Sequence, residues 1–234
     1  MSTYLEQHPP RQTQFRRPRR GVPSGVIVVH TAESVMDTVG PDTGAENVAA
    51  FIANRSDYGS YHTLVDSDSI VRLVPYDAEA YGDGTGSNTH AIHISFACSA
   101  ADWPRMSKAR RDAFIRNGAA AAAHAARWLE DDRDIRVPAR RITRGQSESR
   151  VPGFISHGER DPGRRSDPGA AFPWDAFLDQ YDELVNPKPK KGPLGPVKKE
   201  LRQAQREARK ADRPGLVERI KQLRLSAIRR NKKK

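Results

Sequence analysis

The sequence has one cysteine, Cys98, among 234 residues, so neither an intramolecular disulfide nor a cysteine-rich zinc module can form. Long apolar runs are also missing, since no stretch approaches the about 18–20 consecutive apolar residues that a membrane span needs. The first ten residues contain no apolar segment, and we therefore expect no secretory signal peptide. These absences predict a protein that is made in a reducing compartment.

Positive charge is unevenly distributed along the chain. The whole sequence carries 40 Lys and Arg against 29 Asp and Glu, a net charge of +11. Residues 187–234 hold 18 basic and 4 acidic residues, whereas residues 21–186 carry a net charge of −7. The excess charge therefore belongs to a tail and to a short arginine-rich arm at residues 1–20. An acidic central segment argues against nucleic acid as the physiological partner of the whole chain.

Strand and helix patterns alternate through the central segment. Short β-branched or alternating runs predict strands at residues 25–30, 61–65, 70–74 and 90–98. Helical spacing and capping residues predict helices at residues 45–54, from Ser107 onward and from Pro173 onward. Residues 139–172 are rich in Gly, Pro, Arg and Asp and predict a loop. The interleaved pattern predicts an α/β domain with a central mixed β-sheet flanked by helices.

Composition predicts four segments. A basic arm at 1–21 precedes a domain at 22–185, and a linker at 186–196 contains four prolines and two glycines. Beyond the linker, residues 197–234 repeat apolar positions at helical spacing on both sides of a Pro-Gly pair. This tail is therefore expected to form a basic amphipathic helical hairpin.

Three histidines stand where a functional side chain could emerge from the fold. His30 ends the first predicted strand, His62 begins another, and His157 lies in the Gly- and Asp-rich segment. Two histidines, one carboxylate and one open position make a hydrolytic zinc site. A histidine satisfied within the core is the alternative for each of them. No His-Glu-x-x-His motif is present, so composition alone does not establish a metal site.

Three successive motifs resemble the type 2 N-acetylmuramoyl-L-alanine amidases, a family that includes bacteriophage endolysins and the peptidoglycan recognition proteins. They are VIVVHTA at residues 26–32, YGSYHTLVD at 58–66, and His157 followed by RSDPGAAFPW at 165–174. The resemblance extends from about Val22 to Leu184. The last motif is the most specific, because it combines a histidine, a basic residue and an Asp-Pro-Gly at the family's spacing.

The resemblance implies a zinc ion bound by His30, His157 and Asp167. Asp161 opens a second Asp-Pro-Gly, but it lacks the Phe-Pro-Trp continuation and follows His157 too closely for the family pattern. Asp167 is therefore the predicted third ligand.

The resemblance also implies catalytic roles for Tyr61, beside the metal, and for Arg165, as the family's basic residue. On the substrate side it points to Tyr81 and Asn88. Many relatives have a Trp-His or Ser-His pair where this chain has Ala80-Tyr81-Gly82, and in this sequence the pair is missing. His93 either replaces the missing histidine or is structural.

The implied activity is zinc-dependent hydrolysis of the amide bond between N-acetylmuramic acid and L-alanine in peptidoglycan, by a monomeric phage endolysin. Such a protein is expected to remain in the host cytoplasm until lysis and then to act on the cell wall. The basic tail is expected to bind anionic envelope polymers or lipid. The alternatives are a non-catalytic peptidoglycan-binding protein of the same fold, and a nucleic-acid-binding protein acting through its tail.

Overall fold

The computed structural model describes residues 5–7, 14–187 and 203–204. The chain divides after Asn186 into two units, and the first of them forms the sheet and its covering helices. The predicted linker beyond Pro187 and the predicted helical hairpin lie outside the described residues, apart from Gln203 and Ala204. Among the helices of the described residues, none combines the length and apolar character that crossing a membrane requires.

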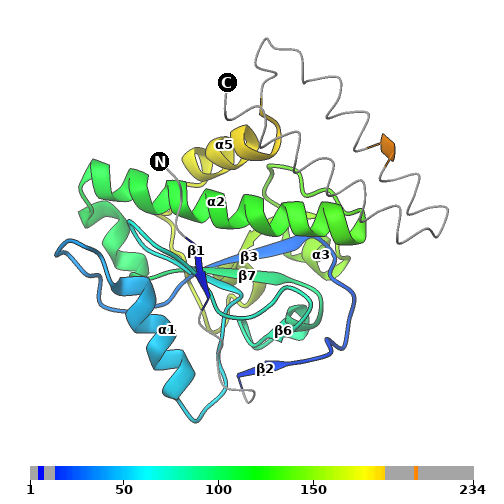
Figure 1. The fold of residues 1–234 in the computed structure, drawn as a ribbon, viewed down its shortest axis with the longest axis horizontal. Coiled ribbons are helices and arrows are strands. Elements are labelled where there is room, and N and C mark those ends of the chain that lie inside the picture. Colours follow the sequence, from blue (N-terminus) through cyan, green and yellow to red (C-terminus); the bar gives the residue numbers. More distant parts are fainter. Residues whose placement is uncertain (1–4, 8–13, 188–202, 205–234) are drawn as a thin grey trace. The chain divides into compact units, whose positions relative to one another are not determined.

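A six-stranded mixed sheet forms the centre of the domain (Figure 1). In spatial order its strands are β1 (Leu5–Gln7), β5 (Ile70–Arg72), β4 (Thr63–Val65), β7 (Ile92–Phe96), β3 (Val26–Thr31) and β8 (Gly153–Ser156). β4 and β5 are antiparallel, and every other neighbouring pair in this sheet is parallel. A separate antiparallel pair joins β2 (Phe15–Arg16) to β6 (Glu79–Ala80).

Helices cover both faces of the sheet, which confirms the predicted α/β architecture (Figure 1). The longest helix, α2 (Lys108–Arg133), packs with α5 (Trp174–Val185) on one face. On the opposite face, α1 (Gly44–Asn54) packs against β4 and β5. The side chain of Ser107 caps α2 by accepting a hydrogen bond from the backbone of Arg110 at 3.3 Å, as its sequence position predicts.

The strand β7 separates an apolar face from a polar one. Ile92, Ile94 and Phe96 belong to the core beneath α2, whereas His93 and Ser95 alternate with them and lie on the other face. His30 pairs with Ser95 across β3 and β7, so it lies on that second face as well. The side of the sheet away from α2 therefore carries the buried histidines.

The expectation of a loop at 139–172 is wrong in its middle part. This segment contains α3 (Arg144–Glu148), β8 and α4 (His157–Arg160). β8 has only two large apolar residues, Phe154 and Ile155, which is too short a run for a periodicity to be visible. The strand forms because it pairs with β3 and buries these two side chains on opposite faces of the sheet.

Candidate metal centre and its cleft

Two adjacent parallel strands bring the predicted histidine ligands together. His30 lies near the end of β3, and His157 directly follows β8 and opens α4. Val29 pairs with Ser156, so both chains leave the sheet at the same edge. Asp167 reaches this point from the loop after α4, where its carbonyl oxygen accepts a hydrogen bond from the backbone of Gly158 at 2.8 Å.

The ligand atoms of the three side chains converge. His30 Nδ1 lies 3.1 Å from His157 Nδ1 and 3.3 Å from Asp167 Oδ2, and His157 Nδ1 lies 3.1 Å from Asp167 Oδ1. Ligands about 2.0–2.1 Å from a tetrahedral zinc ion lie about 3.3 Å from one another. The donor set of two imidazole nitrogens and one carboxylate and the spacing of these atoms therefore fit a zinc ion.

The second nitrogen of each imidazole has a partner that favours the metal-binding tautomer. His157 Nε2 lies 3.3 Å from the backbone oxygen of Asp83. A carbonyl can only accept, so Nε2 carries the proton and Nδ1 keeps its lone pair. His30 Nε2 lies 3.1 Å from Nδ1 of His93, and donation in that direction leaves His30 Nδ1 free for a metal.

Burial and hydrogen bonding keep His30 and Asp167 in the protonation states that a metal needs. Burial lowers the pKa of His30, which favours the neutral imidazole. Burial raises the pKa of Asp167, but hydrogen bonds with His157 and His30 outweigh it and hold that pKa below its usual value. A neutral imidazole and an ionised carboxylate are the ligand forms of these residues.

His93 is held closely in place behind His30. Its ring stacks on that of His62 with centroids 5.7 Å apart, and its backbone N–H donates to Nδ1 of His62 at 3.0 Å. Gly82 also lies close to His93, since a Cβ atom at position 82 would come within 2.3 Å of the His93 ring. The buried Nε2 of His93 finds no hydrogen-bond partner in the part of the chain that the structure describes.

Tyr61 and Arg165 lie on the walls of one cleft with His157. The Tyr61 ring centroid is 5.0 Å from that of His30. Burial, followed by the nearby charge of Asp167, raises the pKa of Tyr61 to about 12. The side chain of Arg165 is exposed. Asp161, the rival ligand, pairs with Arg164 and is not part of the convergent group.

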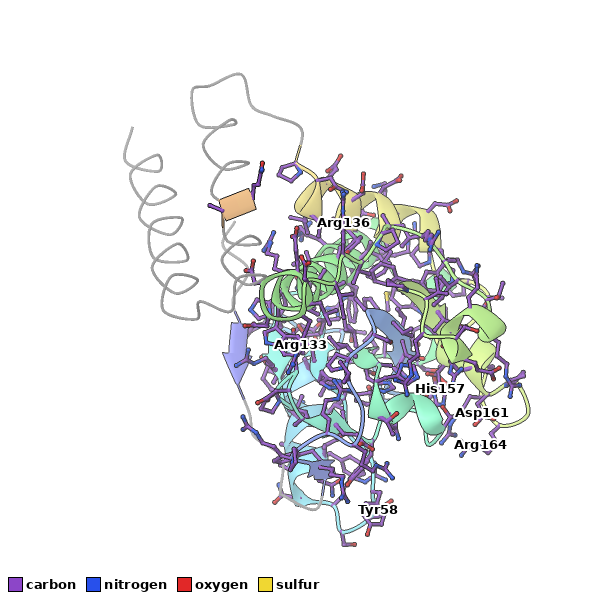
Figure 2. The ribbon with its side chains drawn as sticks, turned by 90° about the vertical axis from the view of Figure 1, so that its right-hand side faces the viewer. Tyr58, Arg133, Arg136, His157, Asp161 and Arg164 are labelled. Atoms are coloured by element: carbon purple, nitrogen blue, oxygen red, sulfur yellow. The ribbon has the colours of Figure 1, made fainter. Side chains whose placement is uncertain are left out.

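The cleft has a volume of about 540 Å³ and also includes the two predicted substrate residues. Tyr81 packs edge-on against Tyr58 at 5.6 Å between ring centroids. The carboxamide oxygen of Asn88 accepts hydrogen bonds from the backbone of Gly82 and of Asp83, both at 3.1 Å. Figure 2 labels Tyr58, His157 and Arg164, which all line this cleft.

Sequence reasoning missed the part that the loop after β6 plays in the centre. Its Asp83 carbonyl contacts His157, and its Gly82 backbone contacts His93. The glycines at positions 82, 84 and 86 are typical of a turn, but they do not indicate which residues such a turn approaches. The contact of Asp83 is made by a backbone carbonyl, which every residue type has, so the sequence alone does not reveal it.

Comparisons with known proteins identify a family by sequence and similar folds among solved structures. Residues 19–170 match the sequence profile of a family described as N-acetylmuramoyl-L-alanine amidase. The crystal structure of Staphylococcus aureus hydrolase AmiA in complex with its ligand superposes with a TM-score of 0.54 at 15% identity, covering 80% of this chain and 89% of that one. A selenomethionine derivative of AmpD gives a TM-score of 0.50 at 20% identity, covering 77% and 96%. No curated protein sequence matches the chain.

Proposed function

This chain belongs to the family of the N-acetylmuramoyl-L-alanine amidases, and we propose that it uses a zinc ion to hydrolyse the amide bond between the lactyl group of N-acetylmuramic acid and L-alanine in peptidoglycan. The observation that carries the zinc assignment is the convergence of His30, His157 and Asp167 within 3.1–3.3 Å. When bound, zinc supplies a Lewis acid that polarises the scissile carbonyl and lowers the pKa of a water molecule.

The side chains around the centre have complementary tasks in this proposal. His30 and His157 would bind zinc through Nδ1 as neutral imidazoles, and Asp167 would contribute one negative charge. Because the zinc ion carries two positive charges, the site would keep a net positive charge. Arg165 donates hydrogen bonds to the oxygen of the scissile carbonyl as negative charge develops on it. Arginine stays charged throughout and acts as a donor rather than as an acid.

Tyr61 orients the reacting groups by hydrogen bonding. With a pKa of about 12, its hydroxyl stays protonated at neutral pH and remains able to donate. Its half-buried position beside His30 keeps the hydroxyl in a site from which water is partly excluded. Tyr81 and Asn88 are the proposed contacts for the substrate further along the cleft.

We further propose that the protein is a phage endolysin, monomeric, whose basic tail concentrates it on anionic envelope polymers or lipid. Support comes from the charge distribution of the sequence, in which residues 187–234 hold 18 basic and 4 acidic residues. A purely binding role is disfavoured, because the full ligand set for a hydrolytic metal is present and buried.

The direct test treats purified bacterial cell walls with the protein, with and without a chelator, and then with zinc restored. We expect new L-alanine amino groups to be released, to disappear with the chelator and to return with zinc. Release that persists in chelator at undetectable zinc content contradicts the zinc assignment. Wall binding without release replaces the proposal with the non-catalytic alternative.

A further inference from the structure

The N-terminal arm forms part of the wall of the catalytic cleft. β2 pairs with β6, and this places Arg16 opposite Glu79. On one side of Arg16, the buried side chain of Gln14 donates to the backbone oxygens of Arg55 at 3.0 Å and Asp57 at 2.9 Å. The arm is therefore anchored to the loop that follows α1.

Arg19 anchors the arm on the other side of Arg16. Its guanidinium donates to the backbone oxygens of Tyr76 at 2.9 Å, Asn88 at 3.2 Å and Ala91 at 2.5 Å. Burial lowers the pKa of Arg19 to about 10, so the group is still charged at neutral pH. Arg16, fixed between the buried Gln14 and the partly buried Arg19, keeps an exposed side chain that lines the cleft.

The cleft is rich in arginine, but most of these charges are already neutralised. Its arginines are Arg16, Arg20, Arg55, Arg164 and Arg165. Arg20 pairs with Glu79, Arg55 with Asp57 and Arg164 with Asp161. Among the described residues, Arg16 and Arg165 have no carboxylate partner. Two positive charges are therefore available to a bound molecule.

These two arginines reach the cleft from different elements. Arg165 stands two residues before the proposed ligand Asp167, whereas Arg16 comes from the arm and lies outside the residues 19–170 that match the family. A guanidinium binds a carboxylate through two parallel hydrogen bonds. The peptide stems of peptidoglycan carry free carboxylates, and in some cell walls these are amidated and uncharged.

We propose that Arg16 is a specificity-determining residue that binds a free carboxylate of the peptide stem and makes the protein select anionic stems over amidated ones. The inference rests on the proposed function, because it assumes that the cleft receives a muramoyl peptide. It assigns the arm a role in recognising the substrate, in addition to any contribution of its charge to solubility.

The test compares two synthetic muramoyl peptides that differ only in having free carboxylates or carboxamides on the stem. Arg16→Gln is expected to raise KM about tenfold for the carboxylate substrate and to leave KM for the carboxamide substrate unchanged. A tenfold change corresponds to the lower end of the contribution that a hydrogen bond to a charged group makes. Arg17→Gln is the matched control. Arg17 is the exposed neighbour of Arg16, but it pairs with Asp77 and does not line the cleft. Equal zinc content and equal thermal stability of the variants exclude a folding defect.

Equal changes of KM for the two substrates in Arg16→Gln, or no change for either, would overturn the proposal. If the unmodified protein hydrolyses neither substrate, the proposed function fails, and calorimetry of the two stem peptides then tests Arg16 separately. Weaker binding of the carboxylate peptide alone by Arg16→Gln supports the proposal, whereas unchanged binding contradicts it.

Discussion

The two histidines of the proposed zinc site have different partners behind them. The backbone oxygen of Asp83 accepts from His157. Nε2 of His30 lies 3.1 Å from Nδ1 of His93, which accepts from it when His30 Nδ1 binds the metal. Every residue type has a backbone carbonyl, which accepts hydrogen bonds, whereas a side-chain acceptor is lost when the residue is replaced. The partner of His30 is therefore the one that substitution can remove without disturbing the backbone.

Replacing His93 by Phe keeps a ring of similar size but removes the acceptor. We expect zinc affinity to fall about 10–100-fold, the range for lost second partners of metal-binding histidines. The free energy of unfolding of the metal-free protein should change little, because removing the unpartnered Nε2 of His93 offsets the loss of the partner of His30 Nε2. Competition with a fluorescent chelator measures the first quantity and urea unfolding the second. His124→Phe, away from the centre on α2, is the control; an unchanged zinc affinity in His93→Phe would contradict the expectation.

The two Asp-Pro-Gly motifs offer a matched pair of substitutions. Asp167→Asn should lose bound zinc and amide hydrolysis, because a neutral carboxamide replaces the charged ligand beside His30 and His157. Asp161→Asn should retain both, since Asp161 pairs with Arg164 instead. Metal analysis of the purified proteins distinguishes them. Retention of stoichiometric zinc by Asp167→Asn rules out this ligand set.

At the scale of secondary-structure elements, the contact between α2 and the sheet depends on one glycine. A Cβ atom at Gly118 would lie 2.3 Å from the ring of Phe96, which is fully buried on β7. The helix approaches the strand closely because nothing projects at this position. Alternation in β7 predicts that Phe96 is buried, but only the packed structure shows that it faces a glycine.

We expect Gly118→Ala to destabilise the fold by about 1–3 kcal/mol, because the core must shift to accept the extra methyl group. Gly145→Ala, on α3, is the control: no atom lies within 4 Å of a Cβ built there, and alanine favours helix over glycine by about 0.5–1 kcal/mol. Urea unfolding of both variants measures the effects. A Gly118→Ala protein as stable as the parent would show that the core has room for the methyl group.

At the scale of the whole molecule, buried histidines couple folding to pH. Burial lowers the pKa of His90 to about 4 and holds that of His62 well below its usual value of 6.5. Between about pH 4 and 6.5 the unfolded chain therefore binds more protons at these residues than the folded chain does. Their contribution to stability is present above about pH 6.5 and is lost as the pH falls toward 4.

The expected outcome is a smaller loss of stability on acidification when His90 is replaced. Urea unfolding of the metal-free parent and of His90→Gln at pH 7.5 and 5 measures the difference. Asp66, whose pKa burial raises to about 7, acts in the opposite direction, so the comparison between the two proteins isolates the histidine. An equal or larger loss in His90→Gln contradicts the assignment.

The proposed role of the tail predicts a salt dependence that hydrolysis itself lacks. Binding of the full chain to cell walls should weaken steeply between about 50 and 300 mM salt, because exposed charges are screened over about 10 Å at 0.1 M. Binding should also weaken on walls stripped of anionic polymers, because the proposed partner of the tail is then missing. Hydrolysis of a small soluble muramoyl peptide whose stem is amidated should change little over the same range. Salt-independent wall binding contradicts an electrostatic tail.

Local patterns in the sequence were enough to predict several of the strands and helices and the proposed metal ligands. Alternation located β7, and helical spacing located α2 and α5, because each of these elements buries one face that repeats along the sequence. A continuous β-branched run located β3, which is buried on both faces. The proposed ligands His30, His157 and Asp167 followed from a family motif, since ligand chemistry restricts the residue types that can stand there. The structure brings these three together.

Other features depend on contacts between residues that are far apart in sequence. β8 forms only because β3 lies beside it, and His93 becomes the partner of His30 across 63 residues. The placement of Arg16 in the cleft likewise requires β6 and the anchors Gln14 and Arg19. The local sequence around these residues does not predict which residues they contact. The free energy of each contact comes from burial and hydrogen bonds that exist only in the folded chain.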